Sequence, residues 1–295
     1  MRTNKSINPG QIVKAYLYGD TIELTANNIH QSQSIIVLPH HQYVVIKTGE
    51  IKQMNTSSVS RKDNIASLKR TMRKLRRLIS NNFPGGKDEL WVTLTYSQNI
   101  NAMHQDDTKI VYNDFKIFMQ KTRKLIGKLD YIAVLEPQSS GRWHLHVLLK
   151  TSDNSELYIP NSTMEKLWGK GFTSTKRLSR HDNVAAYVMA YVTNLRIDNE
   201  TSKKRDIKGA RLYLYPKGTK IYRRSKGIVE PKVIKATTKR KLKEKYRLSE
   251  DNRRGTYKQV FAIKPQKKIT TQTEFFNKEY IDNKHNKRKI KSLKS

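Results

Sequence analysis

The alternation of apolar and polar positions predicts short strands and amphipathic helices that follow one another along the middle of the chain. Apolar runs of strand length alternate there with stretches in which apolar residues recur every three or four positions. The predicted elements are strands at residues 90–96, 131–136, 142–150 and 172–177, and helices at residues 111–128, 161–167 and 183–195. This succession is typical of an α+β fold, with an antiparallel sheet and helices packed on it.

The segments on either side of this region have different patterns. Residues 1–58 contain short alternating apolar runs and are expected to form a small β-rich N-terminal portion. Residues 60–81 predict an amphipathic helix with a basic polar face, which would lead a core domain at 60–200. Residues 201–250 are expected to be a basic DNA-binding extension, and residues 251–295 a C-terminal segment with a disordered basic tail.

The charge of the chain indicates a polyanionic partner. Lys and Arg number 59 against 25 Asp and Glu, which gives a net charge of +34. Such an excess favours nucleic acid over a membrane surface. The chain has no cysteine, so disulfides and thiolate zinc sites are excluded. No apolar stretch approaches the length of a membrane span, so a cytoplasmic protein without a membrane partner is expected.

Three residues have the types and spacing of a metal site. His144 and His146 alternate on one predicted strand, so both point to the same face of the sheet. Glu136 ends the preceding strand, and a five-residue loop at 137–141 would place Glu136 opposite Arg142, on that same face. Two imidazoles and a carboxylate suit a divalent ion such as Mn²⁺ or Mg²⁺. The alternative is that the three are ordinary polar residues of the core.

Two tyrosines on the helix predicted at 183–195 are candidate nucleophiles. Tyr187 and Tyr191 are four residues apart and therefore lie on one side of the helix. A phenol has a pKa of about 10, so attack on a phosphodiester requires a cation or a polarised phosphate nearby. The alternative is that both rings merely pack on the sheet. Tyr187 is favoured as the first nucleophile because it lies nearer the positive end of the helix dipole.

These motifs resemble the HUH endonuclease superfamily, and within it the rolling-circle replication-associated (Rep) proteins of plasmids, integrative elements and filamentous-type phage. The matching segments are residues 92–96 (Val-Thr-Leu-Thr-Tyr), Glu136 with residues 141–146 (Gly-Arg-Trp-His-Leu-His), and residues 186–192 (Ala-Tyr-Val-Met-Ala-Tyr-Val). The resemblance extends over about residues 60–235. It implies a ferredoxin-like core and metal-dependent nicking of single-stranded origin DNA. It also implies a 5′-phosphotyrosyl intermediate and a free 3′-OH for a host polymerase.

The third motif departs from the family pattern, in which a lysine often follows a tyrosine by three or four residues. Here those positions hold Ala190, Tyr191, Asn194 and Leu195. The positive charge would then come from Lys176, Arg177 or Arg180. The chain has no Walker phosphate-binding motif, so DNA unwinding is expected to need a separate host helicase.

The residues expected to contact DNA are basic positions near the motifs and in the basic extension. They are Arg142, Lys176, Arg177, Arg180, Lys203, Lys204, Arg205, Arg211, Arg223 and Arg224. Two alternatives to a replication initiator remain open at the level of sequence. One is a conjugative relaxase or transposase that uses the same chemistry. The other, from a different class, is a non-catalytic basic regulator that binds nucleic acid.

Overall fold

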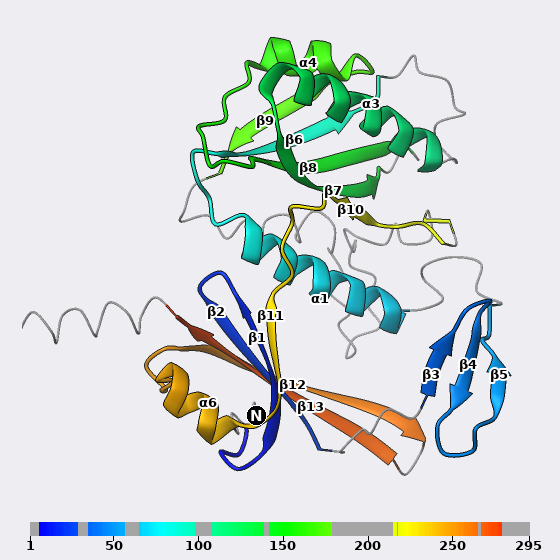
Figure 1. Ribbon diagram of the computed structural model, residues 1–295, viewed down its shortest axis with the longest axis vertical. Coiled ribbons are helices and arrows are strands. Elements are labelled where there is room, and N and C mark those ends of the chain that lie inside the picture. Colours follow the sequence, from blue (N-terminus) through cyan, green and yellow to red (C-terminus); the bar gives the residue numbers. More distant parts are fainter. Residues whose placement is uncertain are drawn as a thin grey trace, which may run out of the picture. The chain divides into compact units, whose positions relative to one another are not determined.

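The computed structural model describes residues 6–28, 35–56, 65–97, 108–138, 142–178, 215–216, 218–264 and 267–278. The chain divides into two compact units, shown in Figure 1. Ser57–Glu230 form the first, here called the central unit. Met1–Thr56 and Pro231–Ser295 together form the second, here called the terminal unit.

The central unit is built on a five-stranded sheet in the order β10-β7-β8-β6-β9, with every neighbouring pair antiparallel. The strands are β6 (Glu89–Thr95), β7 (Leu129–Pro137), β8 (Trp143–Thr151), β9 (Thr173–Arg177) and β10 (Tyr222–Arg224). Helix α3 (Thr108–Ile126) connects β6 to β7, and helix α4 (Asn161–Trp168) connects β8 to β9. This succession of strand, helix, strand, strand, helix and strand confirms the predicted α+β class. The helix predicted at 183–195 lies outside the described residues.

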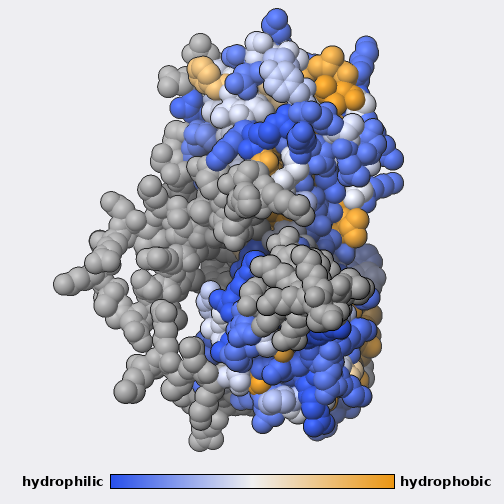
Figure 2. Space-filling model, turned by 90° about the vertical axis from the view of Figure 1, so that its left-hand side faces the viewer, coloured by the Kyte–Doolittle hydropathy of each residue, from blue (hydrophilic) through white to orange (hydrophobic). Residues whose placement is uncertain are grey.

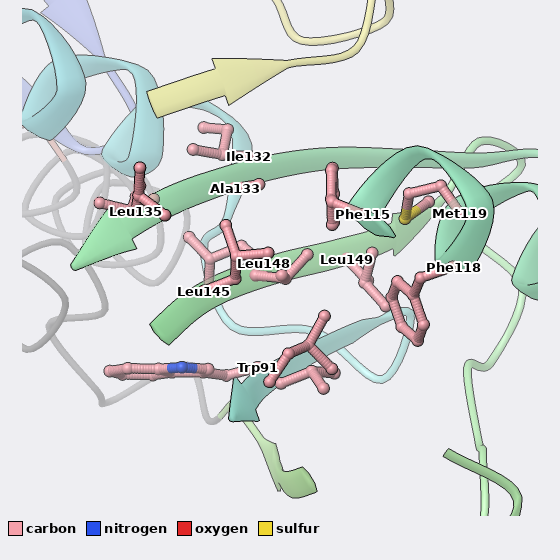
Figure 3. Packing of buried hydrophobic residues seen from close by; sticks show 14 of the residues in the cluster. Trp91, Phe115, Phe118, Met119, Ile132, Ala133, Leu135, Leu145, Leu148 and Leu149 are labelled. Atoms are coloured by element: carbon pink, nitrogen blue, oxygen red, sulfur yellow. The ribbon is translucent and has the colours of Figure 1, made fainter. Parts of the chain in front are cut away.

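Helices cover the two faces of this sheet differently. Helices α3 and α4 lie on one face, and α1 (Ile65–Asn82) lies on the other (Figure 1). Phe115, Phe118 and Met119 of α3 are buried, and Figure 3 shows Phe118 beside Leu149 of β8. The ring centroids of Phe115 and Tyr131 are 5.0 Å apart. These contacts follow from the apolar stripe of α3, which recurs at helical spacing and needs an apolar face to cover.

The terminal unit contains a second antiparallel sheet made from both ends of the chain, in the order β11-β1-β2-β13-β12. Its strands are β1 (Ile12–Tyr18), β2 (Thr21–Asn27), β11 (Lys232–Thr238), β12 (Arg253–Lys264) and β13 (Lys267–Asn277). Helix α6 (Lys239–Tyr246) contributes Leu242 to a core with Ile22, Leu24 and Phe276. A separate three-stranded sheet comprises β3 (Ile35–Leu38), β4 (Gln42–Val45) and β5 (Ile51–Gln53).

The boundaries expected from sequence differ from these units. Residues 1–58, 201–250 and 251–295 were expected to be separate segments, whereas the structure joins most of them in the terminal unit. The central unit extends to Glu230 instead of ending at 200, because β10 completes its sheet. Strand pairing links residues far apart in sequence, as Ile22 and Phe276 show, and local periodicity carries no information about such pairs.

The surface in the view of Figure 2 is mainly hydrophilic where the chain is described, with scattered hydrophobic residues. This agrees with the large excess of basic residues. Within the described ranges, no helix combines the length and the apolar character that crossing a bilayer requires.

Candidate active site

The β7–β8 hairpin brings the three candidate metal ligands to one face of the central sheet. Glu136 pairs with His144, and Val134 pairs with His146. The sequence-based expectation had placed Glu136 opposite Arg142, so the register differs from it by two residues. Paired residues share a face and side chains alternate along a strand, so a displacement by two preserves the shared face. This face, which carries Glu136, His144 and His146, is called the site face below.

The closest contact among the three joins His146 and Glu136. The Nε2 atom of His146 lies 2.6 Å from the Oε2 atom of Glu136. The His146 side chain is 5% exposed and the Glu136 side chain 21%, so this hydrogen bond is largely shielded from water. The ring centroids of His144 and His146 are 6.4 Å apart. The carboxylate and both imidazoles therefore lie together at the hairpin end of the sheet.

Strand β6 completes the surroundings of His146. Thr93 pairs with His146, and its Oγ1 atom lies 3.3 Å from the Nδ1 atom of the ring. The Trp91 ring contacts the same imidazole edge-on, with 5.8 Å between centroids. Both ring nitrogens of His146 thus have a polar partner, and this fixes the orientation of the ring. Thr93 was identified from sequence only as part of a motif strand, because its role depends on a partner 53 residues away.

The donor set fits a divalent ion in its chemistry, since two imidazoles and one carboxylate leave positions for water or phosphate oxygens. Over the part of the chain that the structure describes, no group of three His, Asp or Glu side chains has the spacing of a formed metal site. Glu136 and His146 instead contact each other directly. The structure thus brings the expected ligands to one place without arranging them around an ion.

Several predicted site residues lie outside the described residues. They are Tyr187, Tyr191, Arg180, Lys203, Lys204, Arg205 and Arg211. Of the others, Arg142 immediately precedes β8 and is partly exposed, and Lys176 is exposed on β9. Trp91 pairs with Lys176, so Lys176 belongs to the site face.

Three of the predicted DNA-contacting arginines are engaged within the protein. The Arg177 guanidinium lies 3.2 Å from Glu156 and also donates to the backbone carbonyl of Lys87. Arg224 contacts Glu230 at 2.6 Å. Arg223 lies over the ring of Tyr112 of α3, 3.8 Å from its centroid, on the face opposite to the site. These contacts give each arginine a structural role in the central unit.

Residues 89–196, rather more than a third of the chain, match the family model of the ORF2-type replication-associated proteins. Neither the curated proteins nor the solved structures gave a significant match. The matched segment contains Glu136, His144 and His146, and it extends through Tyr187 and Tyr191. This part of the chain is similar to replication-associated proteins, and the similarity supports a role in DNA replication.

Proposed function

We propose that this protein initiates rolling-circle replication by nicking single-stranded origin DNA through attack by a tyrosine. The observation that carries the proposal is the contact between Glu136 and His146, with His144 on the same sheet face. This constellation lies inside the segment that resembles replication-associated proteins. A role limited to binding would not require a carboxylate and two imidazoles at one point of the sheet.

The architecture of the central unit supports an HUH endonuclease core. The succession β6-α3-β7-β8-α4-β9 and the strand order β7-β8-β6-β9 agree with a ferredoxin-like plan. In this plan β8 and β6 lie side by side in the middle of the sheet, so the histidines of β8 are held on a rigid strand. Rigid placement matters because catalytic groups lose efficiency when displaced by even about 1 Å.

Glu136, His144 and His146 would hold a divalent Mn²⁺ or Mg²⁺ ion. When bound, the ion would supply Lewis acidity that polarises a phosphate oxygen. The hydroxyl of Thr93 would keep the His146 ring oriented by accepting a hydrogen bond from Nδ1–H. The burial of His146 excludes water from one side of the site and strengthens its interactions with charge.

The covalent step is assigned to Tyr187 or Tyr191. The phenolic oxygen forms a bond to phosphorus, and the bond from phosphorus to the 3′ oxygen breaks. The phenol proton is lost, and the leaving 3′ oxygen takes up a proton to become a free 3′-OH. The resulting 5′-phosphotyrosyl link preserves the energy of the phosphodiester, so a second transfer can rejoin the displaced strand. A host polymerase would extend the 3′-OH, and a host helicase would unwind the duplex.

The test uses single-stranded oligonucleotides tiled across the replicon that carries the gene, incubated with the full chain and Mn²⁺ or Mg²⁺. A denaturing gel should show a covalent protein–DNA adduct, and peptide mapping should locate it on Tyr187 or Tyr191. His144→Ala should abolish nicking and retain DNA binding, whereas His40→Ala, at an exposed histidine of the terminal unit, serves as the matched control.

Two results would contradict the proposal. An adduct that persists in the Tyr187→Phe/Tyr191→Phe double variant would show that another residue is the nucleophile. The absence of any nick across the whole replicon, with metal present, would favour a non-catalytic DNA-binding regulator.

A further inference from the structure

Strand β9, at one edge of the central sheet, presents a line of exposed side chains next to the site. The residues at its alternate positions, Phe172, Ser174 and Lys176, are exposed, and Thr173 and Thr175 between them are half-buried. The Phe172 side chain is among the largest exposed apolar groups described, at 70% exposed. Alternation along a strand places the three exposed residues on one face of the sheet.

Strand register identifies that face as the site face. Ser174 pairs with Thr93, and Thr93 in turn pairs with His146. The backbone N–H of Thr95 donates to the carbonyl of Phe172 at 2.9 Å, which continues the same register by one row. Phe172 therefore lies in line with Thr95 and His144.

Neighbouring strands are about 4.8 Å apart, so Phe172 is roughly 10 Å from His144 across the sheet. Adjacent nucleotides of an extended single strand can span such a distance.

The backbone that carries Phe172 is held firmly although its side chain is exposed. Gly171 has φ +146°, and a Cβ atom added there would lie 2.3 Å from the backbone nitrogen of Ser97. Ser97 N–H donates to the Lys170 carbonyl at 2.9 Å, and the Trp168 indole donates to the Thr95 carbonyl at 3.0 Å. An aromatic ring left in solvent on a fixed backbone contributes little to folding, so its retention points to a ligand.

We propose that Phe172, Ser174 and Lys176 form a track for single-stranded DNA that leads to the site, with an unpaired base stacked on the Phe172 ring. Lys176 would contact a phosphate, and the Ser174 hydroxyl would donate a hydrogen bond to the strand. Aromatic side chains on a sheet surface bind unpaired bases in this way, and stacking does not depend on sequence. The net charge of +34 makes a nucleic acid the occupant with matching charge. This inference rests on the proposed nicking function and adds the path of the substrate.

The experiment measures binding of the full-length chain to a labelled oligothymidylate by fluorescence anisotropy, without metal. Phe172→Ala should weaken binding roughly tenfold, the effect expected when one stacked base loses its aromatic partner. Phe172→Leu, which keeps an apolar side chain without a ring, should weaken it to a similar extent, and Phe172→Tyr should restore binding. Affinity for duplex DNA should not change, because paired bases cannot stack on the ring.

Tyr158→Ala is the matched control, because Tyr158 is also 70% exposed. The neighbouring Leu157 bonds to the carbonyl of Lys87, just before β6 begins, so Tyr158 lies near the end of β6 opposite to Thr95. Its removal should leave binding unchanged.

Wild-type affinity in Phe172→Ala, or an equal loss in Tyr158→Ala, would overturn the inference. The proposed function fails separately. If the wild type forms no adduct on any origin strand but still loses affinity through Phe172→Ala, the nicking proposal is wrong and the base-binding track stands. If the wild type nicks and Phe172→Ala binds normally, only the track is wrong.

Discussion

Ionisation of Glu89 should destabilise the central unit at neutral pH. Glu89 begins β6 and is only 1% exposed. Its burial raises the pKa of the carboxyl from 4.5 to about 7, although the backbone N–H of Gly85 donates to it at 2.9 Å and opposes the shift. Lys150 pairs with Glu89 and also opposes it, but less strongly. The perturbation chosen is Glu89→Gln, which keeps the size and one acceptor oxygen and removes the charge.

The magnitude follows from the difference between the folded and unfolded pKa values. Each pKa unit corresponds to about 1.4 kcal/mol, so a pKa of about 7 against 4.5 amounts to roughly 3 kcal/mol. The folded state binds the proton more tightly than the unfolded chain does. The corresponding stability is therefore fully present below pH 4.5 and is lost as the pH rises through about 7.

The assay is urea unfolding of wild type and Glu89→Gln between pH 5 and pH 8.5, followed by tryptophan fluorescence. All three tryptophans, Trp91, Trp143 and Trp168, lie in the central unit, so the signal reports on that unit. The variant should gain roughly 3 kcal/mol relative to wild type across this range. Glu165→Gln, at an exposed position of α4, controls for loss of a carboxylate in general. A stability difference between Glu89→Gln and wild type that does not change with pH would refute the reasoning.

Three further predictions test other parts of the structure. Thr93→Val should weaken Mn²⁺ binding about tenfold in calorimetry, because the His146 ring loses the group that orients it; Thr93→Ser should bind normally, and equal affinity in both variants would contradict this role. Lys239→Met should cost roughly 3–5 kcal/mol in the terminal unit, because it strands the fully buried carboxylate of Glu274, 2.8 Å from Lys239 Nζ. Faster hydrogen exchange in β13 would report that loss, and unchanged exchange would contradict it. Gly171→Ala should destabilise the central unit by about 3 kcal/mol because its Cβ would overlap the β6 backbone, and a fluorescence-detected loss below about 1 kcal/mol would show that the turn relaxes.

Local periodicity was sufficient to predict the elements of the central unit. Helix α3 was expected at 111–128 and spans Thr108–Ile126, and β8 was expected at 142–150 and spans Trp143–Thr151. The hairpin register was wrong by two residues, because the loop and not the periodicity sets it. The shared face of Glu136, His144 and His146 was nevertheless predicted, since a shared face depends only on whether the displacement is even.

Charge counting was less informative, because it does not distinguish a solvated cation from a buried one. Lys239 belongs to the run interpreted as a DNA-binding extension, yet it is 4% exposed and paired with Glu274 on β13. Its Nζ also donates to the carbonyl of Ile7 at 2.8 Å, and this ties the beginning of the chain to α6. Arg224 was likewise expected to contact DNA and is paired with Glu230. Such partners are distant in sequence, so no local pattern could reveal them.

The position of the candidate site follows from where polar residues replace apolar ones along three strands. On the site face, the order along each strand is Trp91, Thr93, Thr95 in β6; Ile132, Val134, Glu136 in β7; and His144, His146, Leu148 in β8. The opposite face stays apolar throughout, because α3 and α4 cover it. Polar residues therefore come last in β6 and β7 but first in β8. Since β8 runs antiparallel to both neighbours, only this reversal brings Thr95, His144 and Glu136 into one row. A strand direction opposite to the observed one would have separated the carboxylate from both imidazoles by the length of the sheet.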